Sequence, residues 1–204
     1  MDKLVTQPEA ASGAQGAGVH LRVVGCGNSW ASDDSAGLEV VRRLRASGGF
    51  DCELLELPQA GVELMEVLDG AESVLFIDAV SSGAPPGTIH LVPLPSQDIE
   101  LRALGAISSH GWGVAEVLRL MSALRRPIPR LLLLGIEIEA AIPGGARSPA
   151  VEEAIRVAVE RFPALCAMLR AGENMSRLSP CRFSPGACSF PGRGGDSPIA
   201  EGGL

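Results

Sequence analysis

Residues 21–37 read LRVVGCGNSWASDDSAG: a run of branched apolar residues, a loop with two glycines, two consecutive aspartates and the start of a helix. The apolar run predicts a strand that is covered on both faces of a sheet. In α/β proteins, ligands lie where the carboxyl end of a strand faces the amino end of a helix. We therefore expect this loop to deliver Asp34 to a small metal-handling site, which Asp78 and His110 would complete.

Strands and helices alternate along the following sequence. Strands are predicted at 20–26, 52–57, 73–77, 88–92 and 130–136, and helices at 34–46, 61–68, 114–124 and 149–169. The link 80–88 is too short for a crossover helix, so the fourth strand is expected antiparallel to the third, at a sheet edge. The pattern predicts a three-layer α/β/α domain with a twisted, mostly parallel, five-stranded sheet.

This domain is expected to span residues 20–171. Residues 1–19 are predicted to form a flexible N-terminal extension, and residues 172–204, rich in Gly, Pro and Ser, a disordered tail. We find no signal peptide and no stretch approaching the roughly 20 apolar residues of a membrane helix. The expectation is a cytoplasmic protein that does not insert into a membrane and acts as a monomer.

Charge and composition exclude several classes of protein. The net charge is −7, there is no basic run, and aromatic residues make up only 3% of the chain, so a nucleic-acid partner is not expected. The cysteines number five, an odd count, and form no C-x-x-C pair, so neither a disulfide framework nor a zinc-thiolate site fits. Reduced thiols, three of them packed in the core, are expected.

Each candidate site residue also has an ordinary structural explanation. Asp33 or Asp34 is expected to cap the helix that follows, which leaves the other aspartate in surplus. Asp78 follows a buried strand, where an ionised carboxylate is costly unless it is paired or ligated, although it could simply cap the next turn. His110 lies in a glycine-containing loop before a helix, whereas His20 and His90 are expected to be ordinary surface or loop residues. Two carboxylates and one imidazole suit Zn, Ni or Fe with open coordination positions.

Two other sites are conceivable in the same region. The spacing Gly25-x-Gly27 invites a dinucleotide site, with Glu56 as the acid that binds ribose. However, that fingerprint requires a third glycine where this chain has Trp30. A Cys26–His110 dyad is also conceivable, but Cys26 ends an apolar strand and is expected to pack in the core.

Five segments, in order, resemble the motifs of the hydrogenase maturation proteases. GCGNSWASDDSAG at 25–37 resembles the family's opening motif G-x-G-N-x-x-x-x-D-[DE]-G-x-G. FIDAV at 76–80, PGT at 86–88, SSHGWG at 108–113 and LGIE at 134–137 are similar to its later segments. The resemblance covers about residues 21–170 and implies a fold of the phosphorylase/hydrolase-like type. Ser35 replaces a usual glycine, and PQAG at 58–61 lacks the family's G-G-T.

The resemblance implies an endopeptidase that removes the C-terminal extension of the [NiFe] hydrogenase large-subunit precursor after nickel insertion. It implies that Asp34, Asp78 and His110 are both the metal-contacting and the catalytic residues. The nickel would be supplied by the precursor, and either the metal or a carboxylate would activate water. A non-catalytic nickel-sensing chaperone and a nucleotide-binding α/β protein are the alternatives.

Overall fold

The computed structural model describes residues 20–58, 63–94, 114–171 and 181–184, and one sheet runs through all four ranges. The strands are β1 (Leu21–Cys26), β2 (Glu53–Leu57), β3 (Ser73–Val80), β4 (Ile89–Leu94), β5 (Arg130–Glu137) and β6 (Cys181–Phe183). The helices are η1, a 3₁₀ turn (Ser32–Ser35), α1 (Ala36–Ser47), α2 (Glu63–Leu68), α4 (Val114–Ala123) and α5 (Pro149–Arg170).

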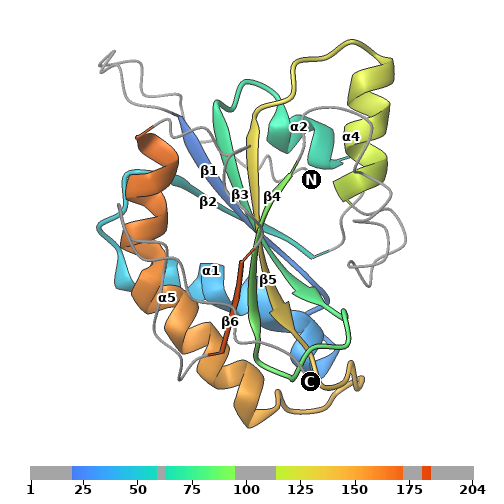
Figure 1. Ribbon diagram of the computed structural model, residues 1–204, viewed down its shortest axis with the longest axis vertical. Helices are drawn as coiled ribbons and strands as arrows, with labels where there is room; N and C mark the ends of the chain where they lie inside the picture. The colour runs from blue at the N-terminus through green and yellow to red at the C-terminus, as the bar shows by residue number, and fades with distance from the viewer. Residues whose placement is uncertain (1–19, 59–62, 95–113, 172–180, 185–204) are drawn as a thin grey trace, which may run out of the picture.

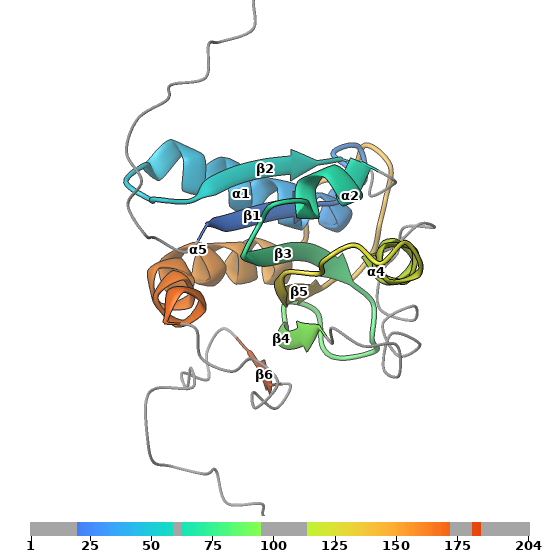
Figure 2. The ribbon, with the colours of Figure 1, turned by 90° about the horizontal axis from the view of Figure 1, so that it is seen from above.

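The sheet has the strand order β2-β1-β3-β5-β4-β6 (Figures 1 and 2). Strands β2, β1, β3 and β5 are parallel, and β4 and β6 add two antiparallel pairings. Helices α1 and α5 cover one face, and α2 and α4 cover the other. The predicted three-layer, mostly parallel α/β fold is thereby confirmed. The short β6 is an addition to the five expected strands and lies within the segment expected to be a disordered tail.

The position of β4 differs from the prediction. Its direction is as expected, but its neighbour is β5 and not β3, and β6 takes the outer place at the edge. The turn before β4 closes on the end of β5, where the Gly87 amide donates to the Glu137 carbonyl at 2.8 Å and the Glu137 amide to Thr88 at 2.9 Å. The link after β3 is therefore long enough to pass over one strand, since neighbouring strands lie only about 4.8 Å apart.

The starts of two helices test the capping predictions. Neither Asp33 nor Asp34 caps α1, because both lie in η1 and the N-cap residue is Ser35, whose side chain makes no capping bond. That part of the prediction was wrong, since a 3₁₀ turn separates the aspartates from the helix. The start of α5 is as predicted: the Ser148 hydroxyl accepts from the Val151 amide at 3.4 Å, and Pro149 takes the first helical position.

The sheet separates two apolar cores. Alternation along β3 sends Leu75 and Ile77 into the core beneath α1 and α5, and Phe76 into the core beneath α2 and α4. The same alternation places Asp78 on the α2/α4 face, two residues beyond Phe76. The candidate site thus lies on that face, at the carboxyl end of the parallel strands.

Candidate functional site

The glycine loop after β1 folds back onto the backbone of Asp34. Gly27 has a φ of 140°, and a Cβ built on it would stand 2.1 Å from the Asp34 carbonyl oxygen. The Asn28 amide donates to that same oxygen at 3.1 Å. Only glycine can occupy this position without a clash. The loop therefore fixes Asp34, whose side chain is buried, at the carboxyl end of β1.

A second glycine brings α1 against the strand ends. A Cβ on Gly37 would lie 2.1 Å from the Ile77 carbonyl oxygen and 2.4 Å from that of Cys26. This close contact sets the beginning of α1 between the ends of β1 and β3, and η1 itself contacts β3. The element that carries Asp34 is therefore held beside the strand end that carries Asp78.

Asp33 has a structural role that the sequence did not reveal. Its carboxylate is only 2% exposed and accepts three backbone N–H bonds, from Ser148 at 2.6 Å, Glu139 at 3.0 Å and Ala140 at 3.3 Å. These donors belong to the loop between β5 and α5. Asp33 thus ties that loop to η1, and Asp34 is the aspartate of the pair that remains a site candidate.

Asp78 is buried at the end of β3. Its Oδ1 accepts from the Ala79 amide at 2.8 Å, which fits the simple turn-capping explanation as far as that oxygen is concerned. Burial, and secondarily the nearby Asp78 charge, raise the pKa of the Cys26 thiol well above its usual range. Because a nucleophilic cysteine requires a lowered pKa, these surroundings count against the Cys26–His110 dyad.

His110, the third predicted site residue, lies outside the described residues. It precedes Val114, the first residue of α4, by four positions, and α4 packs on the sheet face to which Asp78 belongs. Within residues 20–58, 63–94, 114–171 and 181–184, no three His, Cys, Asp or Glu side chains are grouped so as to hold a metal ion. The structure thus brings the elements of Asp34 and Asp78 together, and His110 stays a prediction.

Comparison with known proteins agrees with this architecture. A family model described as hydrogenase maturation protease matches residues 38–164. The chain belongs to the hydrogenase maturation protease family. The matched range contains Asp78 and His110 and begins four residues after Asp34. The predicted family is confirmed.

Two relatives and one solved structure illustrate the similarity. The hydrogenase expression/formation protein HupD of Thiocapsa roseopersicina is 33% identical over 69% of this chain and 64% of its own length. The hydrogenase 2 maturation protease of Escherichia coli is 29% identical over 76% of this chain and 93% of its own. The structure of the hydrogenase maturating endopeptidase HybD from E. coli has a TM-score of 0.60 at 25% identity, and the match covers 75% of this chain and 94% of that one.

A buried polar cluster around Glu137, one strand from Asp78, was not predicted from the sequence. His90 is only 5% exposed, and its Nε2 lies 3.0 Å from Oε2 of Glu137, so the prediction of an ordinary surface histidine was wrong. Glu137 also accepts from the Ser82 amide and hydroxyl at 2.6 and 2.8 Å, and from the Gly83 amide at 2.8 Å. The cluster fixes the turn that follows β3.

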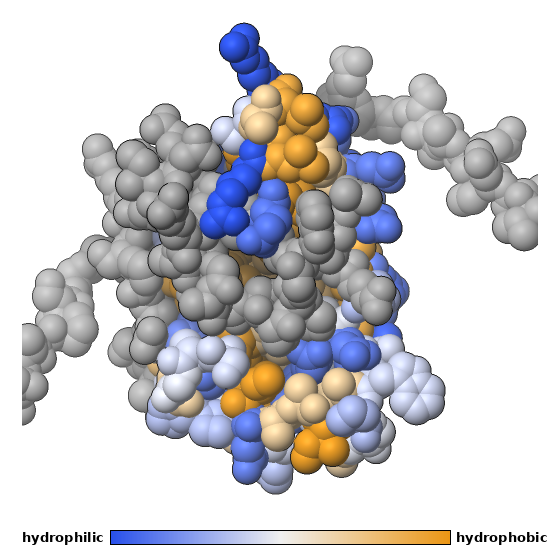
Figure 3. Space-filling view, turned by 90° about the vertical axis from the view of Figure 1, so that its right-hand side faces the viewer, coloured by the Kyte–Doolittle hydropathy of each residue, from blue (hydrophilic) through white to orange (hydrophobic). Residues whose placement is uncertain are grey.

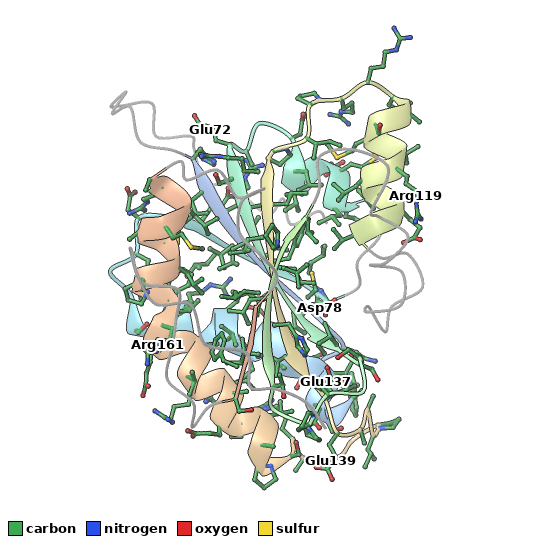
Figure 4. The ribbon with its side chains drawn as sticks, viewed as in Figure 1. Glu72, Asp78, Arg119, Glu137, Glu139 and Arg161 are labelled. Atoms are coloured by element: carbon green, nitrogen blue, oxygen red, sulfur yellow. The ribbon has the colours of Figure 1, made fainter. Side chains whose placement is uncertain are left out.

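The position of this cluster follows from strand register. Asp78 and His90 flank Gly135 on its two neighbouring strands, and Glu137 follows two residues later. Figure 4 shows Asp78 and Glu137 toward one end of the sheet and Glu72 at the other. The sequence did contain one signal that His90 is buried: it is a polar residue within the apolar stretch at 89–94. Alternation along the strand turns His90 to the same side as the apolar Val92.

Burial alone raises the pKa of Glu137, but the hydrogen bonds from Ser82, Gly83 and His90 outweigh it, and the pKa lies below its usual range. The carboxylate is therefore held in its charged form. Its bonds are internal to the fold, which marks Glu137 as a residue that positions the end of β3.

Two features count against a dinucleotide site. Glu56, the expected ribose-binding acid, forms ion pairs with Arg42 at 2.9 Å and with Arg45. Trp30 is 78% exposed, so it does not take the place of the glycine that packs a helix on a strand. Gly37 makes that contact in this chain, seven residues later.

The side of the molecule that carries α4 has exposed apolar residues. Figure 3 shows apolar side chains gathered at the upper end of this face, and further apolar patches at its lower end. Leu124, next to the end of α4, and Ile142, in the loop before α5, are exposed. No helix in the described part of the chain is long and apolar enough to cross a membrane.

Proposed function

We propose that this protein is an endopeptidase that removes the C-terminal extension of a [NiFe] hydrogenase large-subunit precursor after nickel insertion. Family membership supports the reaction class and the kind of substrate. The observation that carries the proposal is a pair of buried carboxylates, Asp34 and Asp78, on elements that meet at the carboxyl ends of β1 and β3. The protease would act as a monomer in the cytoplasm.

In this proposal nickel belongs to the substrate. Asp34, Asp78 and His110 would add two oxygens and one nitrogen to the nickel that the precursor already holds, a donor set that this metal accepts. Contact with the loaded centre would place the scissile bond beside the two carboxylates. A precursor without nickel would lack this anchor, so cleavage would depend on prior loading.

Two routes for water attack remain within the proposal, an aspartic-type and a metal-assisted one. In the first, Asp34 or Asp78 takes the proton from the attacking water as a general base. In the second, the substrate's nickel polarises the scissile carbonyl and the carboxylates serve as ligands. An Asp→Asn change removes the base but keeps one oxygen as a weaker ligand, so a variant that reaches the wild-type rate at saturating nickel-loaded precursor would exclude the first route for that residue.

The test is cleavage of nickel-loaded precursor by the purified protein, followed by intact-mass measurement of the product. Asp34→Asn, Asp78→Asn and His110→Ala are each expected to slow cleavage at least about 100-fold. Asp69→Asn and His20→Ala are the matched controls, because Asp69 is exposed and pairs with Arg126 and His20 is exposed. Unfolding midpoints close to that of the wild type would show that the site variants are folded.

Other outcomes would contradict the proposal. Wild-type protein that binds loaded precursor without cutting it would indicate a non-catalytic nickel-sensing chaperone. Wild-type cleavage rates in all three site variants would remove these residues from the site. Saturable nucleotide binding that is lost in Gly27→Val would favour the nucleotide-binding alternative.

A further inference from the structure

The second half of α5 is fastened to the chain just before β2 by three contacts spaced one helical turn apart. The rings of Phe162 and Phe50 meet edge to face, with centroids 4.8 Å apart. One turn further along the helix, Cys166 lies in the core against which Cys52 also packs, and each thiol affects the electrostatics of the other. The guanidinium of Arg170 donates to the Asp51 carbonyl and lies 3.5 Å from the Asp51 carboxylate.

This arrangement makes the two cysteines a matched pair. Positions 162, 166 and 170 lie on one stripe of α5, because residues four apart share a helix face. Both thiols pack at the same apolar core, with Cys166 buried and Cys52 partly exposed. An accessible thiol beside a second cysteine is the arrangement in which one thiol can attack an oxidant and the other can resolve the mixed disulfide.

The electrostatic surroundings differ for the two thiols. The hydrogen bond from Cys166 lowers the pKa of Cys52, with a further contribution from Arg170, against the opposing effects of burial and Asp51. The same hydrogen bond and burial raise the pKa of Cys166. Cys52 is therefore the thiol that reaches the reactive thiolate form first.

We propose that Cys52 and Cys166 form a redox-modification site, at which a low-molecular-weight disulfide such as oxidised glutathione converts the two thiols into a reversible intramolecular disulfide. No disulfide was expected from the cysteine count and spacing, because the two residues are far apart in sequence. The fold, and not a sequence motif, brings them together.

The reaction balances with oxidised glutathione as the only oxidant. The Cys52 thiolate attacks one glutathione sulfur, forming a mixed disulfide and releasing one glutathione thiolate. The Cys166 thiol then loses its proton and attacks the Cys52 sulfur, forming the protein disulfide and releasing the second glutathione. Two electrons pass from the cysteine pair to the oxidant, and the two protons leave with two reduced glutathiones.

The other cysteines are placed differently. Cys26 is buried in the core beneath α2 and α4, on the opposite face of the sheet. Cys181 lies in β6, at the sheet edge opposite β2, and Cys188 is outside the described residues. Cys166 is about 27 Å along α5 from Ser148, which Asp33 contacts, so the bridge would form far from the proposed nickel site. The disulfide proposal and the peptidase proposal can therefore be tested, and rejected, independently of each other.

The test treats the reduced full-length protein with oxidised glutathione, blocks free thiols by alkylation, and measures intact mass and peptide maps. We expect a species about 2 Da lighter with a Cys52–Cys166 linkage, reversed by dithiothreitol. The bridge closes a loop of more than 100 residues, so the thermal midpoint should rise by roughly 5–10 °C. The cleavage rate on nickel-loaded precursor should stay unchanged.

Variants distinguish the attacking cysteine, Cys52, from the resolving cysteine, Cys166. Cys166→Ser should stop at a glutathione adduct on Cys52, about 305 Da heavier, whereas Cys52→Ser should leave Cys166 unmodified because it is buried. Cys26→Ala is the matched control and should form the bridge as the wild type does. Three outcomes would overturn the proposal: a wild type whose thiols stay reduced, one that stops at the glutathione adduct, or one whose bridge joins other cysteines. The wild-type measurement alone decides this if a variant fails to fold.

Discussion

Asp33→Ala is expected to be among the most destabilising single changes near the site, although Asp33 itself is not a proposed ligand. The variant removes one carboxylate that accepts three backbone N–H bonds across more than 100 residues of sequence. It leaves the amides of Glu139, Ala140 and Ser148 without this acceptor. The loop before α5 would lose its attachment to η1.

The expected loss follows from the bonds that disappear. A hydrogen bond to a charged group contributes about 1.5–3 kcal/mol, and the three donors are only partly buried, so we take the lower part of that range for each. Three such bonds give a total of about 4.5–6 kcal/mol of unfolding free energy. Asp33→Asn should lose less, because its amide oxygen still accepts. Asp69→Ala is the control: its exposed pair with Arg126 should contribute about 0–1 kcal/mol.

Urea unfolding at neutral pH measures these differences directly. Hydrogen exchange adds a local readout, since the amide of Ser148 should exchange faster in Asp33→Ala than in the wild type. A loss below about 1 kcal/mol, or unchanged exchange at Ser148, would refute the argument that Asp33 holds this loop.

Two further predictions concern the close contact of α1 and the pH dependence of the fold. Gly37→Ala should lower the unfolding free energy by about 1–3 kcal/mol or more, because the new Cβ would meet the carbonyl oxygens of Ile77 and Cys26. An unchanged urea midpoint would contradict this prediction. Glu137 has a lowered pKa in the fold, so its stabilisation is present above the ordinary glutamate pKa of about 4.3 and is lost as the pH falls through the folded value. Glu137→Gln should therefore be less stable than the wild type at pH 7, and its unfolding free energy should fall less steeply between about pH 5 and pH 3. Parallel plots of unfolding free energy against pH for the two proteins would contradict this role of Glu137.

Local patterns predicted most of the elements. The boundaries of β1, β2 and β5 lie within one residue of the predicted ones, because runs of branched apolar residues are decided by short stretches of sequence. The start of α5 was predicted by the Ser148-Pro149 pair for the same reason. The order of five motifs also indicated the family, which the family match confirmed.

Contacts between distant segments were not predictable in the same way. The direction of β4 was predictable but its neighbour was not, since the link before it can reach either β3 or β5. Asp33 and Glu137 bind partners that no spacing rule connects, and Cys52, just before β2, meets Cys166 of α5. His90 appeared ordinary because its burial depends on strands and helices that pack from elsewhere.

The sequence by itself determined the fold class, the family and the glycine loop that leads to Asp34, because each depends on periodicity or on a short motif. Only the tertiary structure decided that Asp33 fastens the loop before α5, that Gly37 sets α1 against β3, and that a buried His90–Glu137 pair supports the turn after Asp78. The physical reason is that hydrogen bonds and close contacts are short-ranged. Which groups come within a few ångströms is decided when the chain packs.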